Sequence, residues 1–262
     1  MLILAKIHNF AEIICVSYLY SMKIETQFRQ SILLIGVILV FNGCLGDSKD
    51  KSGAENTKSS SENLADSFKS AQQGGFKQLV NDFEDKSRVI WQKPDLVIQL
   101  LGDVRNKTVA DIGAGTGYFS FRVLPKAKKV IAIDIDKRFI TFMDSVRAEM
   151  PVEMRPRFEA RLVAPDNPQL QNGEADHVII VNTYMYIENR VEYLKVLKNG
   201  ISKGGKVLII DYKQQTLPVG PPSNIKVAMS EVVKELKSVG FTKITTDETT
   251  LDYQYIITAD NG

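Results

Sequence analysis

The stretch VADIGAGTGYF, residues 109–119, decides the fold. Its apolar start is typical of a buried strand, and Gly113, Gly115 and Gly117 follow where that strand turns into a helix. Glycine lets a backbone turn sharply and lets a ligand approach it closely, and the first amide groups of the following helix are free to bind that ligand. We therefore predict a strand, a ligand-binding glycine loop and a helix.

The chain from Phe76 onward alternates short β-branched runs with longer helical periodicities. This alternation predicts an α/β fold, a three-layer sandwich with a mostly parallel seven-stranded sheet. Candidate strands are 108–112, 130–134, 159–163, 177–182 and 206–211, and the runs 243–246 and 253–258 are expected to form an antiparallel hairpin at the C-terminal edge. Candidate helices are 94–101, 118–124, 137–149, 190–201 and 229–239, and Gly204-Gly205 is expected to stop the fourth.

The details of the glycine loop favour one ligand class over another. Dinucleotide-binding folds place GxGxxG here, but Gly117 comes one residue too early for that pattern, and Tyr118 stands where it requires glycine. Asp111, just before the loop, would repel a pyrophosphate and attract an ammonium group. S-adenosylmethionine has an ammonium group and no phosphate, so the loop favours this ligand.

A second carboxylate strengthens this interpretation. Asp134 ends the next predicted strand, 17 residues beyond Gly117, where a carboxylate can accept hydrogen bonds from both hydroxyls of a ribose. Asp136 is expected to cap the following helix instead. The alternative for Asp134 is a helix cap or a solvated loop residue.

Asp111 to Gly117 together with Asp134 resembles the class I, Rossmann-like S-adenosylmethionine-dependent methyltransferases, over the region from Lys93 to Thr258. This resemblance implies S-adenosyl-L-methionine as cofactor, with Asp111 and the loop around the methionine part, Asp134 on the ribose and Ile135 against the adenine. An acidic residue after the third strand contacts the adenine amine in that family, and Asp166 in VAPDNPQL is its counterpart here. The complete set of expected cofactor-binding residues is Asp111, Gly113, Ala114, Gly115, Thr116, Gly117, Asp134, Ile135, Asp166 and Asn182.

The segments WQKPDLVIQLL, VNTYMYIEN, PVGPP and YQY resemble, more narrowly, a bacterial subgroup of these methyltransferases of unassigned substrate. In that subgroup the segment after the fourth strand often contains Tyr-His-His, whereas this chain has Tyr184-Met185-Tyr186. A role of those histidines therefore does not transfer to this chain.

Methyl transfer from a sulfonium is an in-line displacement, so alignment supplies much of the acceleration and a dedicated base is not always needed. Tyr184 is the first candidate for contact with the acceptor, and Asp211 is a candidate to orient it or to act as a weak base. The alternatives are that Tyr184 packs at the edge of the core and that Asp211 binds its own loop. Trp91 is either part of a lid over the cofactor or a hydrophobic anchor.

Composition bounds the remaining functions. The chain has 33 basic and 31 acidic residues, which indicates no nucleic acid as a partner, and a small-molecule or lipid-like acceptor is expected. Its two cysteines, Cys15 and Cys44, precede the predicted domain, which argues against zinc and cysteine-nucleophile chemistry there. A non-catalytic S-adenosylmethionine-binding or sensor module and a nicotinamide-dependent oxidoreductase remain alternatives to the enzyme.

The N-terminal region is expected to be a targeting segment. Residues 1–44 form a leader in which Met22 is the expected true start, and the segment ending at Cys44 resembles a bacterial lipoprotein signal with lipidation at that cysteine. Residues 45–75 are expected to be a flexible polar linker, and residues 76–262 the folded domain. We expect an exported, membrane-anchored protein; the alternatives are a tethered domain that faces the cytoplasm and a membrane-embedded helical hairpin.

Overall fold

The computed structural model describes residues 75–262. The predictions of a leader, of lipidation at Cys44 and of a polar linker fall outside this described part of the chain. Among residues 75–262, no helix has both the length and the apolar character needed to cross a bilayer.

The described elements alternate along the chain as predicted. The strands are β1 (Thr108–Ile112), β2 (Lys129–Asp134), β3 (Phe158–Leu162), β4 (Ala175–Val181), β5 (Ile201–Tyr212), β6 (Phe241–Asp247) and β7 (Gln254–Asn261). The α-helices are α3 (Arg88–Gln92), α4 (Pro94–Gln99), α5 (Ser120–Val123), α6 (Lys137–Glu149), α7 (Arg190–Gly200) and α8 (Met229–Ser238), and the short 3₁₀ helices are η1 (Arg155–Arg157), η2 (Tyr184–Tyr186) and η3 (Ser223–Ile225). Residues 75–83 are also helical.

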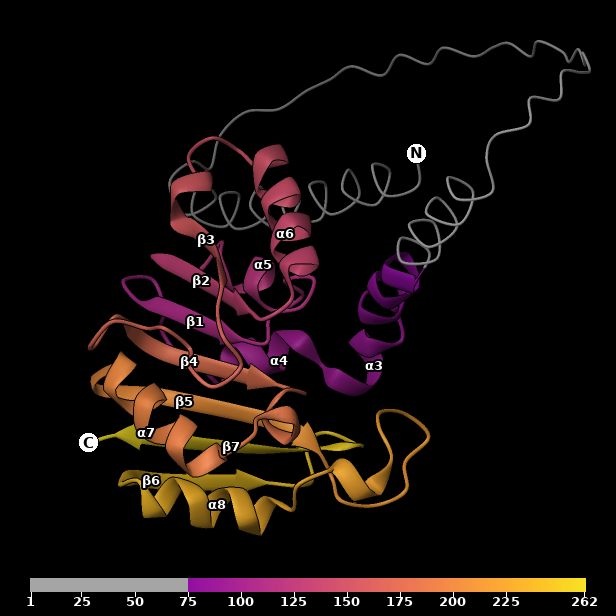
Figure 1. Ribbon diagram of the computed structural model, residues 1–262, viewed down its shortest axis with the longest axis vertical. Helices are drawn as coiled ribbons and strands as arrows, with labels where there is room; N and C mark the ends of the chain where they lie inside the picture. Colours follow the sequence, from indigo (N-terminus) through magenta and orange to yellow (C-terminus); the bar gives the residue numbers. More distant parts are fainter. Residues whose placement is uncertain (1–74) are drawn as a thin grey trace, which may run out of the picture.

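The seven strands form a single sheet in the order β3-β2-β1-β4-β5-β7-β6 (Figure 1). The first five are parallel, and β7 pairs antiparallel with both β5 and β6. The prediction of a mostly parallel sheet with an antiparallel C-terminal hairpin at its edge is therefore confirmed. Because β1 lies between β2 and β4, the loops after these three strands meet at one end of the sheet.

The sheet is buried on both faces, which explains why its strands are almost continuously apolar. Successive residues of β1 point to opposite sides, so Val109 belongs to one core cluster and Ala110 to the other. Helices α4, α5 and α6 cover the first face, with buried residues such as Val97, Phe121 and Phe142. Helices α7 and α8 cover the second face, with Leu194 and Leu236.

One predicted boundary is wrong. The pair Gly204-Gly205 does not stop a helix, because α7 ends at Gly200 and β5 begins directly at Ile201. Instead the glycines lie inside β5, at a shift of register against β4. A Cβ atom on Gly205 would lie 2.5 Å from the carbonyl oxygen of Asp176, so the close approach of the two strands requires glycine there.

Candidate active site

The glycine loop joins the end of β1 to α5 and is held by the neighbouring strand. The amides of Gly113 and Ala114 both donate to the carbonyl oxygen of Ile133, at 2.9 and 3.0 Å. Gly113, Gly115 and Gly117 have φ angles of 70°, 57° and 82°, which side chains rarely tolerate. Cβ atoms on Gly113 and Gly115 would meet the side chains of Thr183 and Phe83. The loop therefore offers a backbone surface to a ligand, as the sequence indicated.

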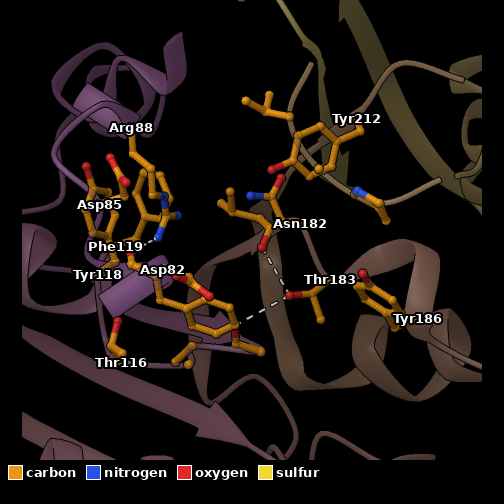
Figure 2. A pocket seen from close by; sticks show the side chains of 18 of the residues that line it. Asp82, Asp85, Arg88, Thr116, Tyr118, Phe119, Asn182, Thr183, Tyr186 and Tyr212 are labelled. Atoms are coloured by element: carbon orange, nitrogen blue, oxygen red, sulfur yellow. Dashed lines mark hydrogen bonds between the residues drawn. The ribbon is translucent and has the colours of Figure 1, made fainter. Parts of the chain in front are cut away.

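A cavity of about 500 Å³ opens beside this loop, at the carboxyl ends of the strands. One wall comes from the segment before β1 and from the glycine loop, and the other comes from the segments after β4 and β5 (Figure 2). Its lining residues include Asp82, Phe83, Asp85, Arg88, Trp91, Asp111, Gly113, Ala114, Gly115, Thr116, Tyr118, Asn182, Thr183, Met185, Tyr186, Tyr212, Val219, Gly220 and Pro221.

Asp111 lines the inner end of the cavity and is almost completely buried. Its carboxylate accepts a hydrogen bond of 2.6 Å from the Ser120 hydroxyl. Burial raises the pKa of Asp111 to about 7, against the lowering effect of that hydrogen bond. The charge of Arg88 also lowers this pKa, to a smaller extent. An ammonium group placed in the cavity would give the buried carboxylate a direct charged partner.

Asp134 lines a second, smaller hollow of about 90 Å³ that shares Gly113, Thr183 and Tyr186 with the first. One carboxylate oxygen accepts from the amide of Asp136 at 2.9 Å and the other from the loop. The backbone of Ile135 makes a third hydrogen bond to this carboxylate, which leaves capacity to accept from a ligand hydroxyl. Burial raises the pKa of Asp134. As expected, Asp136 caps α6 by accepting from the amide of Arg138.

The remaining predicted cofactor residues are placed less uniformly. Ile135 is largely exposed and lines the smaller hollow, where an apolar ring can pack against it. Asn182 lines the large cavity, and Thr116 does so from the glycine loop. Gly117 is not among the lining residues of either hollow; its φ angle of 82° shapes the turn, and a Cβ atom there would meet the Phe121 ring.

Asp166 does not reach either hollow. It is exposed, and its neighbours Ala164 and Pro165 line the smaller hollow instead. The predicted contact of Asp166 with the adenine amine stays a prediction.

The two candidates for contact with the acceptor both lie behind the cavity wall. Tyr184 is fully buried, and its hydroxyl donates to Glu235 on α8 at 2.6 Å. Asp211 is also buried and accepts from the amides of Tyr212 and Met185, at 2.8 and 3.2 Å. The position of Tyr184 matches the structural alternative of core packing. Asp211 binds its neighbour Tyr212 and also the segment after β4, rather than its own loop alone. The tyrosines that line the cavity are Tyr118, Tyr186 and Tyr212.

In the segment before β1 the sequence pointed to Trp91 but gave no sign of Arg88. The guanidinium of Arg88 lines the cavity and lies 4.0 Å from the centre of the Tyr118 ring. Tyr118 is buried, and within residues 75–262 its hydroxyl has no hydrogen-bond partner. An arginine in a cavity wall suits an anionic group such as a carboxylate. No motif surrounds Arg88, so periodicity and spacing alone gave no signal for it.

Trp91 takes the position of a hydrophobic anchor, and its role as a lid over the cofactor stays a prediction. It lines the cavity and packs against the second core cluster. Its ring lies 6.1 Å from that of Tyr212 and 6.2 Å from that of Tyr253. With Tyr186, which is 59% exposed, Trp91 and Tyr212 give the outer cavity an aromatic lining.

Comparisons with known proteins agree with this geometry. Residues 103–259 match the family model described as "Methyltransferase domain". The tRNA U34 carboxymethyltransferase of Actinobacillus succinogenes is 29% identical over 162 residues, which are 61% of this chain and 47% of the relative. The tRNA U34 carboxymethyltransferase of Haemophilus influenzae (strain Rd) is 27% identical over 176 residues, 62% of this chain and 53% of the relative. The chain thus spans about half the length of these curated relatives.

Solved structures show the same fold at low sequence identity. A SAM dependent methyltransferase from Aquifex aeolicus has a TM-score of 0.64 at 21% identity, over 72% of this chain and 98% of its own. The [4+2]-cyclase SpnF has a TM-score of 0.56 at 13% identity, over 64% of this chain and 79% of its own. A shared fold does not by itself fix the reaction.

The expectation that no nucleic acid is indicated as a partner is wrong, because the curated relatives are named as tRNA-modifying enzymes. A net charge of +2 averages over the whole surface and carries no information about a local binding groove. The expectation of an S-adenosylmethionine cofactor, in contrast, is confirmed. The chain belongs to the family of S-adenosylmethionine-dependent methyltransferases, through a methyltransferase domain that spans residues 103–259.

Proposed function

We propose that this domain transfers a methyl group from S-adenosylmethionine to a base of an RNA. The observation that carries the proposal is one cavity with two unlike walls. The glycine loop forms one wall, beside the buried Asp111, and Tyr186 and Tyr212 line the opposite wall (Figure 2). We call these two sides the donor end and the acceptor end. Ring faces of this kind bind unstacked bases, and enzymes that modify a base commonly receive it turned out of its stack. The names of the curated relatives support RNA as the acceptor class.

Each polar group at the donor end would bind one part of the donor. The ionised Asp111 would pair with the donor's ammonium group, and Arg88 would hold its carboxylate. Asp134 would accept from the ribose hydroxyls, and Ile135 would lie against the adenine. Bound in this way, the donor supplies an electrophilic methyl carbon on a positively charged sulfur.

The acceptor end supplies alignment. A base stacked between side chains of the outer cavity would present a ring or exocyclic atom in line with the breaking carbon–sulfur bond. As the new bond forms, the electron pair of the old bond leaves with the sulfur, and the acceptor's proton passes to solvent. Within residues 75–262, the cavity lining contains no histidine, which fits a reaction that depends on alignment.

A second candidate is transfer of a carboxymethyl group, the activity in the relatives' names. One observation favours it: the Arg88 guanidinium in the cavity wall can pair with the carboxylate of such a group as well as with that of methionine. The two candidates share the cavity and differ in the donor, because carboxymethyl transfer needs a sulfonium donor that carries a carboxymethyl group in place of the methyl group.

The test is to incubate the full chain with bulk tRNA from cells that lack this protein, in one reaction with S-adenosylmethionine and in a second with the analogue that carries a carboxymethyl group in place of the methyl group on its sulfur. Nucleosides are then analysed by mass spectrometry, which separates a methyl from a carboxymethyl group. A new methylated base that Asp111→Asn fails to produce would support the proposal. Donor binding without any modified base would instead favour the non-catalytic sensor module, and a carboxymethylated base the second candidate.

A further inference from the structure

The loop between β5 and α8 forms part of the outer cavity wall. It runs from Lys213 to Ala228, contains η3, and projects beyond the end of β5 in Figure 1. Its tip residues Val219, Gly220 and Pro221 line the cavity. Tyr212 lines the cavity as well, on the side opposite the glycine loop (Figure 2).

The tip of this loop is packed directly onto Tyr212. Gly220 has a φ angle of 84°, and a Cβ atom there would lie 2.6 Å from the Tyr212 ring. The same ring packs against Trp91 in the cavity wall. The tip of the loop, Tyr212 and Trp91 therefore form one continuous surface. The position of the two rings depends on the position of the loop.

The base of the loop is closed by one buried lysine. Lys226 is 3% exposed, although lysine is almost never fully buried without a partner. Its ammonium group donates to the carbonyl oxygen of Gln215 at 2.9 Å and lies 5.6 Å from the centre of the Tyr212 ring. Its own carbonyl oxygen accepts from the side-chain amide of Gln214 at 3.2 Å. These bonds join the two ends of the loop beside the ring that its tip contacts.

We propose that Lys226 is a positioning residue that fixes the 213–228 loop against Tyr212, and that this loop selects the acceptor. The choice of an RNA base as acceptor rests on the proposed function, whereas the placement of the loop does not. Asp111 and Asp134 accept their hydrogen bonds from residues within 115–136, outside the loop, so its release leaves the donor end intact. The proposal therefore separates acceptor binding from donor binding.

The test compares Lys226→Met and Lys226→Arg with Lys234→Met, which changes an exposed lysine on α8. For Lys226→Met we expect the KM for the tRNA acceptor to rise about tenfold, with kcat lowered less, and Lys226→Arg to recover part of the loss. The Kd for S-adenosylhomocysteine, measured by titration calorimetry, should stay within about twofold of the wild type. Lys234→Met should match the wild type in every measurement.

Trp91, the only tryptophan of the chain, gives a measurement that needs no acceptor. Release of the loop would uncover its ring, so acrylamide should quench Trp91 fluorescence at least about twice as strongly in Lys226→Met as in the wild type. The proposal would be overturned if active Lys226→Met had the acceptor KM of the wild type. It would also be overturned if the Kd for the donor product rose together with the acceptor KM in this variant. If the wild type modifies no RNA, the proposed function fails, and unchanged quenching in Lys226→Met then overturns the loop placement as well.

Discussion

The carboxylate of Asp134 accepts a hydrogen bond from the backbone amide of Gly115 at 2.8 Å, and so fastens the end of β2 to the glycine loop. The residue proposed to bind the ribose thus also shapes the surface proposed to bind the methionine part. Donor affinity and loop stability are therefore linked through one side chain.

Replacement of Asp134 by alanine should lower both the affinity for the donor and the stability of the protein. A buried amide left without its acceptor costs about 1–3 kcal/mol, so the free energy of unfolding should fall by that amount, and the Kd for S-adenosylhomocysteine should rise. Asp136→Ala is the matched control, because it removes the cap of α6 at a cost of about 1 kcal/mol without touching either hollow. Equal donor affinities in the two variants, measured by calorimetry, would contradict the role of Asp134.

Donor binding should depend on pH through Asp111. Since burial raises its pKa to about 7, the carboxyl group is largely protonated at pH 6 and must ionise to pair with the ammonium group. We expect binding about tenfold weaker at pH 6 than at pH 8, with a proton released on binding near pH 6. Asp111→Asn should bind weakly at both values. Calorimetry in buffers of different ionisation enthalpy measures the number of protons released on binding. A wild-type donor affinity that does not change with pH would refute this prediction.

The same pKa predicts the stability of the free protein. A carboxyl group whose pKa is raised on folding binds its proton more tightly in the folded than in the unfolded state. Its contribution to stability is present below the unfolded value of about 4 and is lost as the pH rises to about 7. The melting temperature of Asp111→Asn should therefore fall less between pH 4 and pH 7 than that of the wild type. An identical dependence of melting temperature on pH in the two proteins would contradict this prediction.

Gly113→Ala should be far more disruptive than Gly204→Ala. Both glycines have positive φ angles, of 70° and 77°, so alanine brings about 1–2 kcal/mol of backbone strain at either position. Only at Gly113 would the new Cβ atom collide, with Thr183 side-chain atoms closer than 3.0 Å, whereas nothing lies within 4 Å at Gly204. Gly113→Ala should therefore also abolish donor binding. Comparable melting temperatures and affinities for the two variants would be inconsistent with the close approach of Thr183 to the loop.

Tyr184→Phe and Tyr186→Phe should have opposite effects. Burial and Glu235 raise the pKa of Tyr184, so its phenol stays protonated and donates to the carboxylate. Loss of this hydrogen bond to a charged group should cost about 2 kcal/mol of stability and change acceptor KM little. Tyr186→Phe should leave the melting temperature unchanged and alter acceptor KM. A stable Tyr184→Phe enzyme with impaired acceptor binding would return Tyr184 to the acceptor site.

Arg88→Met should weaken donor binding more than Arg122→Met. Both guanidinium groups lie over the Tyr118 ring, at 4.0 and 3.7 Å from its centre, but only Arg88 lines the cavity. Loss of a charge-assisted pair with a carboxylate should raise the donor Kd about tenfold or more. Calorimetry with both variants checks this, and equal affinities would exclude a direct role for Arg88.

The fold could be predicted because its information is local. Apolar runs such as VIAIDI are typical of strands buried on both faces of a sheet. The glycines of residues 113–117 mark the turn from β1 into the following helix. The bulge in β5 was missed for the opposite reason. Gly204-Gly205 after a helical pattern is typical of a helix stop, and only the distant Asp176 on β4 shows why glycine is required inside the strand.

The site could be predicted only where one short segment carries it. Asp111 and Asp134 each end a strand beside the loop, so their place follows from spacing alone. Arg88 reaches the cavity through the packing of a segment outside the motif, which no spacing rule describes. Tyr184 lies on the correct segment, but the turn of η2 directs its side chain to Glu235, and Tyr186 faces the cavity instead.

The position of β7 has a consequence for synthesis of the chain. This last described strand is not at the margin of the sheet but between β5 and β6. During translation β5 therefore keeps an open edge, and Phe241–Asp247 has no partner, until residues as far as Asn261 have left the ribosome. The nascent domain cannot complete its sheet from the N-terminus onward, and a ribosome stalled a few codons early would leave an unpaired strand edge exposed to other chains.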